Sequence, residues 1–120
     1  MFDRKFFDPV TCLNAAVATG AGTSVDVAQY QHIVVQLSAA LNATFTVKFA
    51  GSASASAPDF GAAQTGTNLW DYVSSYDLQD PSSVIVGDTG VALTNDSVAN
   101  NCRQYLINVD GLRWFNANIT

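Results

Sequence analysis

The stretch Ala43-Thr44-Phe45-Thr46-Val47-Lys48-Phe49 decides the fold, because apolar and polar side chains alternate along it without a break. The apolar residues stand at odd positions and the polar residues at even positions. A period of two is typical of a β-strand with one buried and one solvated face. The sequence therefore predicts a strand of an antiparallel sheet over residues 43–49.

Residues 31–39 repeat this pattern, and residues 25–27 give a shorter example of it. Further strand candidates are residues 84–86, 91–93, 102–109 and 112–119. About eight short strands separated by turn residues, with no convincing helix pattern, predict an all-β fold. The expected architecture is a single-domain antiparallel β-sandwich of jelly-roll-like form, and the alternative is a small closed β-barrel.

The connections are predicted from their turn residues. Residues 40–42 are short enough for a hairpin between their flanking strands, and Asp110-Gly111 is a strong signal for another. Residues 68–76 are apolar on both faces and are expected to form one central strand. Residues 80–83, which include Pro81, are expected to form a turn.

The length of 120 residues suits one domain spanning 1–120. Residues 51–67 are rich in Gly, Ser, Ala and Thr, so we expect a long loop there. Phe60 lies within it. An aromatic residue in such a loop either anchors the loop to the domain or contacts a partner.

The charge distribution argues against two classes of partner. The chain has ten Asp, no Glu and five basic residues, for a net charge of -5, and it has no basic cluster. Phosphate backbones and anionic membranes attract basic patches, so we expect neither a nucleic acid nor a membrane as partner. No apolar run approaches the length of a membrane-spanning helix, and the first residues do not resemble a secretory signal.

Cys12 and Cys102 are the only cysteines. Two thiols are too few for a disulfide-rich scaffold or a thiolate zinc site. The first interpretation is a pair of buried free thiols. The second is a Cys12–Cys102 disulfide, which needs an oxidising environment.

Two features touch on catalysis. Asp88-Thr89-Gly90 resembles the active-site triplet of retroviral-type aspartic proteases, but it stands late in the chain and follows Gly87. We interpret it as a turn between short strands. His32 is the only histidine and, from the alternation around it, should lie on a sheet surface. We expect a protein that is not an enzyme and has no catalytic residues.

Two kinds of binding site remain as alternatives. Carboxylates are calcium ligands, so a structural calcium ion bound by aspartates is one of them, although no twelve-residue calcium loop is present. The aspartates concerned are Asp71, Asp77, Asp80 and Asp88. Trp70, Tyr72 and Trp114 offer flat apolar faces that suit stacking on a sugar or on a protein partner. No cofactor is expected.

Five stretches resemble short accessory virion proteins of tailed bacteriophages. They are residues 30–37, 43–52, 58–60, 68–73 and 108–114, within a similarity that covers about residues 24–117. The resemblance implies a β-rich structural protein without a reaction, such as a head decoration (cement) protein or a small tail or fibre component. It also implies a location on the virion, on the outer surface of the head, and a homo-oligomer, a trimer, bound to the major capsid protein.

The residues add two points to this expectation. A charge-poor chain rich in Ala, Ser, Thr and Asn suits repeated packing against neighbours. The segment 1–10 carries Phe2, Phe6 and Phe7 and is interpreted either as a first core strand or as an arm whose aromatic residues dock on a neighbouring subunit. As the alternative function we retain a carbohydrate- or receptor-binding module built on the aromatic residues.

Overall fold

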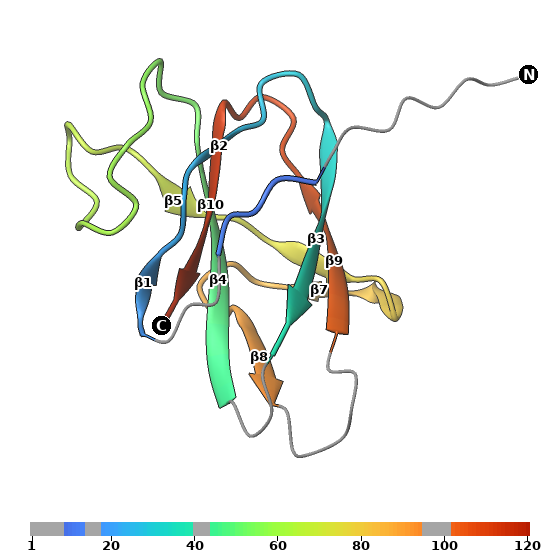
Figure 1. Cartoon of the computed structure of the whole chain (residues 1–120). Coiled ribbons are helices and arrows are strands. Elements are labelled where there is room, and N and C mark those ends of the chain that lie inside the picture. The colour runs from blue at the N-terminus through green and yellow to red at the C-terminus, as the bar shows by residue number, and fades with distance from the viewer. Residues whose placement is uncertain (1–8, 14–17, 40–43, 95–101) are drawn as a thin grey trace, which may run out of the picture.

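The computed structural model describes residues 9–13, 18–39, 44–94 and 102–120, and these residues form an all-β fold (Figure 1). Two antiparallel sheets contain the ten strands of this part of the chain, which has no helix. No helix of sufficient length and apolar character to cross a membrane occurs in the described residues. The strands are β1 (Gly20–Ala21), β2 (Val25–Asp26), β3 (His32–Ser38), β4 (Thr44–Ser52), β5 (Asp71–Tyr72), β6 (Ser75–Asp77), β7 (Asp80–Ile85), β8 (Val91–Thr94), β9 (Cys102–Asn108) and β10 (Trp114–Ile119).

The strands are paired in a nested order. β2 pairs with β10, β3 with β9, β4 with β8 and β6 with β7. The larger sheet has the order β1-β10-β4-β5, with β2 on β10 and β8 on β4, and the smaller sheet has the order β3-β9-β6-β7. The predicted all-β class is confirmed, because the described residues form strands and no helix. The predicted alternative of a closed barrel is wrong, because both sheets are open.

The core combines the apolar side chains of both sheets. Phe49 on β4 packs against Phe115 on β10 and Tyr105 on β9, with ring centroids 5.9 Å apart in both pairs. Val47 and Ile107 are fully buried beside them. Because this cluster joins β4 and β10 to β9, it connects one sheet to the other.

The alternation on which the prediction rested matches the observed burial. In β4, Val47 and Phe49 are buried, whereas Thr44 is exposed and Thr46 and Lys48 are half-buried; Phe45, near the end of the strand, is half-buried as well. β3 alternates in the same way over all seven of its residues. The strands predicted over 43–49 and 31–39 are therefore confirmed within the described residues.

Both predicted hairpins are wrong, because each pair of strands is divided between the two sheets. β3 belongs to the smaller sheet and β4 to the larger one, and the same is true of β9 and β10. The Asp110-Gly111 turn does form: Leu112 N donates to Val109 O at 2.9 Å, and Gly111 has a φ of 84°. This turn carries the chain from one sheet to the other. Residues 40–42 lie outside the described residues.

Two further predictions fail in the segment 68–85. The expected central strand over 68–76 is divided into β5 in the larger sheet and β6 in the smaller sheet, because the chain changes sheets between them. The turn expected at 80–83 lies instead at Leu78-Gln79, and residues 80–83 begin β7. Pro81 is accommodated because β7 is an edge strand.

Candidate functional site

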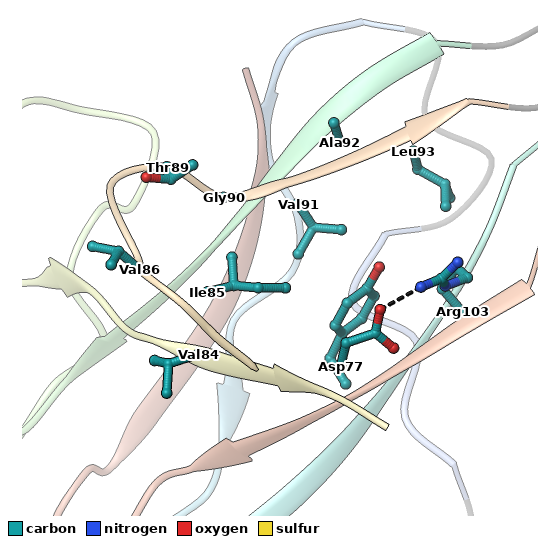
Figure 2. Close-up of a pocket in the computed structure, with 11 residues that line it drawn as sticks. Asp77, Val84, Ile85, Val86, Thr89, Gly90, Val91, Ala92, Leu93 and Arg103 are labelled. Carbon is teal, nitrogen blue, oxygen red and sulfur yellow. Dashed lines mark hydrogen bonds and ion pairs between the residues drawn. The ribbon is translucent and has the colours of Figure 1, made fainter. Parts of the chain in front are cut away.

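A pocket opens between the two sheets beside the β7–β8 turn (Figure 2). Its volume is about 510 Å³. Ile85, Val91 and Leu93 supply apolar walls, and Asp77, Arg103 and Tyr105 line the end that β6 and β9 form. The pocket has the size of a small-molecule site, so its polar groups decide whether it offers a function.

The charged groups of this pocket are paired with each other. Arg103 Nη2 donates to Asp77 Oδ2 from one strand to the next, and Asp77 raises the pKa of the Arg103 guanidinium. Arg103 Nε is buried without a hydrogen-bond partner. Burial also raises the pKa of the Tyr105 phenol. The ion pair links β6 to β9. Because its two charges cancel, it presents no net charge to a ligand.

The Asp88-Thr89-Gly90 triplet forms the turn at the other end of the pocket. Thr89 N and Gly90 N both donate to Val86 O, at 3.0 and 3.1 Å. Gly90 has a φ of 71°, and a Cβ there would lie 2.8 Å from Val47 O. The Asp88 side chain is exposed. Turn geometry and close packing against β4 thus account for the glycine of the triplet.

The aspartates expected at a calcium site do not converge. Asp77 is paired with Arg103, and Asp80 accepts hydrogen bonds from Ser82 and Ser83 that lower its pKa. The Asp71 carboxylate accepts a hydrogen bond from the backbone N–H of Tyr72, the next residue in β5. No group of three or more metal-ligating side chains occurs among the described residues. Only Asp77 and Asp80 are direct neighbours, as partners across the β6–β7 hairpin.

The long loop covers residues 53–70 and is shifted from the predicted 51–67, because β4 continues to Ser52 and β5 begins at Asp71. Asn68 organises its interior: Asn68 Oδ1 accepts from Asp59 N at 2.8 Å, and Asn68 Nδ2 donates to Asp59 O at 2.9 Å. The ring of Phe60 is buried, and Asn118 Nδ2 donates to Phe60 O at 3.0 Å. Phe60 therefore anchors the loop to β10.

The predicted aromatic platform is only partly assembled. Trp70 contacts Tyr72 edge to face, with centroids 5.1 Å apart and an angle of 79° between the planes, and Phe60 packs on Trp70 at 5.8 Å. Trp114 lies on β10 opposite Ser52 of β4. Each indole N–H donates to a loop carbonyl, Trp70 to Ala62 and Trp114 to Ser54. These rings support the loop, and those of Trp70 and Tyr72 are nearly perpendicular.

Both cysteines are free thiols. Cys12 is half-buried, its Sγ lies 3.1 Å from Thr23 O, and burial raises its pKa. Cys102 is exposed at the first position of β9, so the expectation of two buried thiols is wrong for Cys102. It occupies the solvent face because the side chains of β9 alternate from this position onward. Phe2, Phe6 and Phe7 of the predicted arm lie outside the described residues.

The outer face of the smaller sheet carries an apolar row that the sequence analysis missed. Val34 on β3 lies opposite Leu106 on β9, Leu106 opposite Tyr76 on β6, and Tyr76 opposite Val84 on β7. We call these four residues the Val34–Val84 row. Val34 is 56% exposed and Val84 54%. In Figure 2 the side chain of Val84 points to the side of β7 opposite that of Ile85.

On β3 and β9, the outward positions beside this row are uncharged. These positions are His32, Gln36, Ser38, Cys102, Gln104 and Asn108. The predicted surface position of His32 is confirmed by its exposure. An apolar Val34 among polar neighbours was the available signal, but the row is visible only when the order and register of four strands are known.

The comparisons with protein families, with curated proteins and with solved structures found no match for this chain.

Proposed function

We propose that this chain is a non-enzymatic structural protein of a phage virion, a decoration (cement) protein that packs on the head shell beside the major capsid protein. The observation that carries the proposal is the Val34–Val84 row on the outer face of the smaller sheet. The sequence resemblance supplies the virion context. The row supplies a surface suited to a protein neighbour.

The chemistry of this face favours a protein partner. Val34, Leu106, Tyr76 and Val84 form an apolar row across all four strands of the smaller sheet, and Val34 and Val84 are largely exposed. Adjoining exposed apolar groups mark interaction sites, and charged residues are depleted at the centres of protein interfaces. The other outward positions of β3 and β9 are polar but uncharged. Val34 and Val84 would each become buried on docking.

The strand order supports a β-sandwich of jelly-roll type as the finer fold assignment. The nested pairs β2–β10, β3–β9, β4–β8 and β6–β7 are those of a long hairpin wrapped around two facing sheets. Jelly rolls occur in viral capsid proteins and in lectins. The architecture is therefore compatible with the proposed role and with its alternative. The two functions are distinguished by the residues on the surface and not by the fold.

The test is the presence of the chain in virions. Particles purified on a density gradient from host cells that carry the gene should contain its peptides at a constant ratio to the major capsid protein. Val84→Asp should lower this ratio at least tenfold, because docking would bury the new carboxylate. The control is Leu69→Asp, at a site 59% exposed beside the larger sheet, and it should leave the ratio unchanged. Intact particles that lack the unaltered chain would refute the proposal.

The alternative is a carbohydrate- or receptor-binding module in a tail or fibre. A shallow hollow lined by Trp70, Leu69, Ser54 and Leu112 favours it, because Trp70 remains half exposed there. Saturable binding on a glycan array that Trp70→Ala abolishes would support this module. Trp114→Ala serves as the second variant. Binding that neither variant changes would count against it.

A further inference from the structure

The geometry points to a second copy of this chain as the occupant of the free edge of β3: we propose that two copies pair antiparallel through this strand and join their smaller sheets into one. The inference does not rest on the proposed virion role. It rests on the hydrogen-bonding direction of β3, on the composition of its edge and on the incomplete burial of Ile33 and Val35.

The hydrogen-bonding direction follows from one bond. Val109 N donates to Gln31 O at 2.8 Å, so Gln31 and Val109 form a hydrogen-bonded pair in the β3–β9 register. In an antiparallel ladder such pairs alternate with pairs that are not hydrogen-bonded. The backbone groups of Ile33, Val35 and Leu37 therefore point to β9. Those of His32, Val34, Gln36 and Ser38 point to the open edge, where no described strand pairs with them.

The edge of β3 lacks the features that discourage strand addition. It is seven residues long and contains no Lys, Arg, Asp, Glu or Pro. The opposite edge of the same sheet, β7, carries Asp80 and Pro81, and its pairing with β6 contains a bulge. Charges, prolines and bulges are the usual means of protecting an edge. In the larger sheet, β1, β2 and β5 have two residues each and β8 has four.

Two of the three inward side chains of β3 are less covered than their partners on β9. Ile33 and Val35 are half-buried, whereas Tyr105 and Ile107, which lie opposite Val35 and Ile33 on β9, are 2% and 0% exposed. Leu37, the third inward residue, is buried. The apolar layer therefore reaches the edge of the sheet at Ile33 and Val35, where it is only partly covered. An added strand with apolar residues at matching positions would complete it.

β3 is itself such a strand. In an antiparallel pair centred on Val35, Ile33 lies opposite Leu37 of the second copy and Val35 opposite Val35. Directly opposed residues share a face of the sheet, so inward residues meet inward residues. His32, Val34, Gln36 and Ser38 then direct their free N–H and C=O groups at one another. No charged side chain is brought together, although each copy has a net charge of -5.

This contact is isologous, so it closes at two copies. It thus differs from the trimer that the sequence resemblance implies. On the outer face, pairing would place the two Val34–Val84 rows end to end across eight strands, offset by two residues.

The test joins native mass spectrometry with residue-resolved amide exchange of the unaltered chain. We expect a mass of twice 12.7 kDa. At concentrations where the dimer predominates, the amides of Val34 and Gln36 should exchange at least tenfold more slowly than after dilution. The amides of Ile33 and Val35, bonded to β9, should be protected at both concentrations. A monomer at every concentration, a trimer, or a dimer with unprotected Val34 and Gln36 amides would overturn the proposal.

Two variants separate the edge from the face. Gln36→Pro removes an N–H that points to the edge and leaves the bonds to β9 intact, so the dimer mass should be lost while the circular dichroism spectrum is retained. Gln104→Lys places a charge opposite Gln36 on the same face but one strand from the edge, and it should keep the dimer. The reverse result would assign the contact to the face and overturn edge pairing. If Gln36→Pro does not fold, the exchange of the unaltered chain decides.

Discussion

Asn118 on β10 donates a hydrogen bond from Nδ2 to the backbone carbonyl of Phe60, 3.0 Å away, and so attaches the long loop to the centre of the larger sheet. Asn118 is buried, and its Oδ1 has no partner. This buried amide and the buried Phe60 ring therefore help to hold the loop against β10.

Asn118→Ala should loosen this attachment. The Phe60 carbonyl would lose its donor inside the protein, which costs about 1–3 kcal/mol, and the loss of the unpaired Oδ1 offsets part of this. We expect the free energy of unfolding in urea to fall by about 1 kcal/mol, and proteolysis between residues 53 and 70 to become faster. Asn68→Ala is the matched control, since Asn68 binds only within the loop. It should speed proteolysis with a smaller loss of stability.

The two thiols should differ in reactivity. Cys102 is exposed, whereas Cys12 is half-buried and its pKa is raised by burial. The thiolate is the reactive form, so iodoacetamide at neutral pH should label Cys102 at least tenfold faster than Cys12. Peptide mass spectrometry after timed quenching measures both rates. Equal rates, or a Cys12–Cys102 disulfide in the unreduced protein, would contradict this prediction.

Stability should decrease at alkaline pH through Tyr105. Burial raises the pKa of its phenol above the ordinary value of 10.0, so the folded state holds the proton more tightly than the unfolded state does. This contribution is complete below pH 10 and is lost as the pH rises through the folded pKa. Urea unfolding between pH 8 and about 11 measures the slope. Tyr105→Phe should flatten it. Because Cys12 titrates with the same sign, both proteins are compared in a Cys12→Ala background.

Gly87→Ala should destabilise the protein by packing alone. A Cβ on Gly87 would lie 2.7 Å from the backbone carbon of Tyr72 and 2.8 Å from Val73 N, so the β7–β8 turn and the β5–β6 connection must separate. Overpacking of this kind costs about 1–3 kcal/mol. Gly66→Ala is the control, because no atom lies within 4 Å of its Cβ position. Thermal unfolding measures the loss of Tm in each variant. An equal loss of Tm in both variants would exclude a specific contact at Gly87.

Local sequence patterns predict where the strands lie. The sheet that each strand joins depends on its pairing with strands that are distant in sequence. The alternation over residues 43–49 led correctly to β4, and Asp110-Gly111 to a turn. A turn specifies the backbone of its own residues but not the sheet that the next strand joins. For this reason the two hairpins were predicted wrongly.

The site features show the same division. The exposure of His32 followed from the alternation of one strand, and the prediction was correct. The Val34–Val84 row requires the registers of three strand pairs, and the Asp77–Arg103 pair joins residues on two strands that only the fold makes adjacent. Neither has a sequence spacing that would reveal it.

The nested strand order also constrains how the chain folds during synthesis. Asp26 has Trp114 as its partner, and Ile33 has Ile107, so the early strands emerge from the ribosome long before the residues that complete their ladders. Among the described strands, only β4 with β5 and β6 with β7 pair with an immediate neighbour in sequence. Such non-local topologies fold slowly and expose unpaired strands meanwhile. During this interval β3, with its uncharged edge, is open to the addition of a strand from another chain.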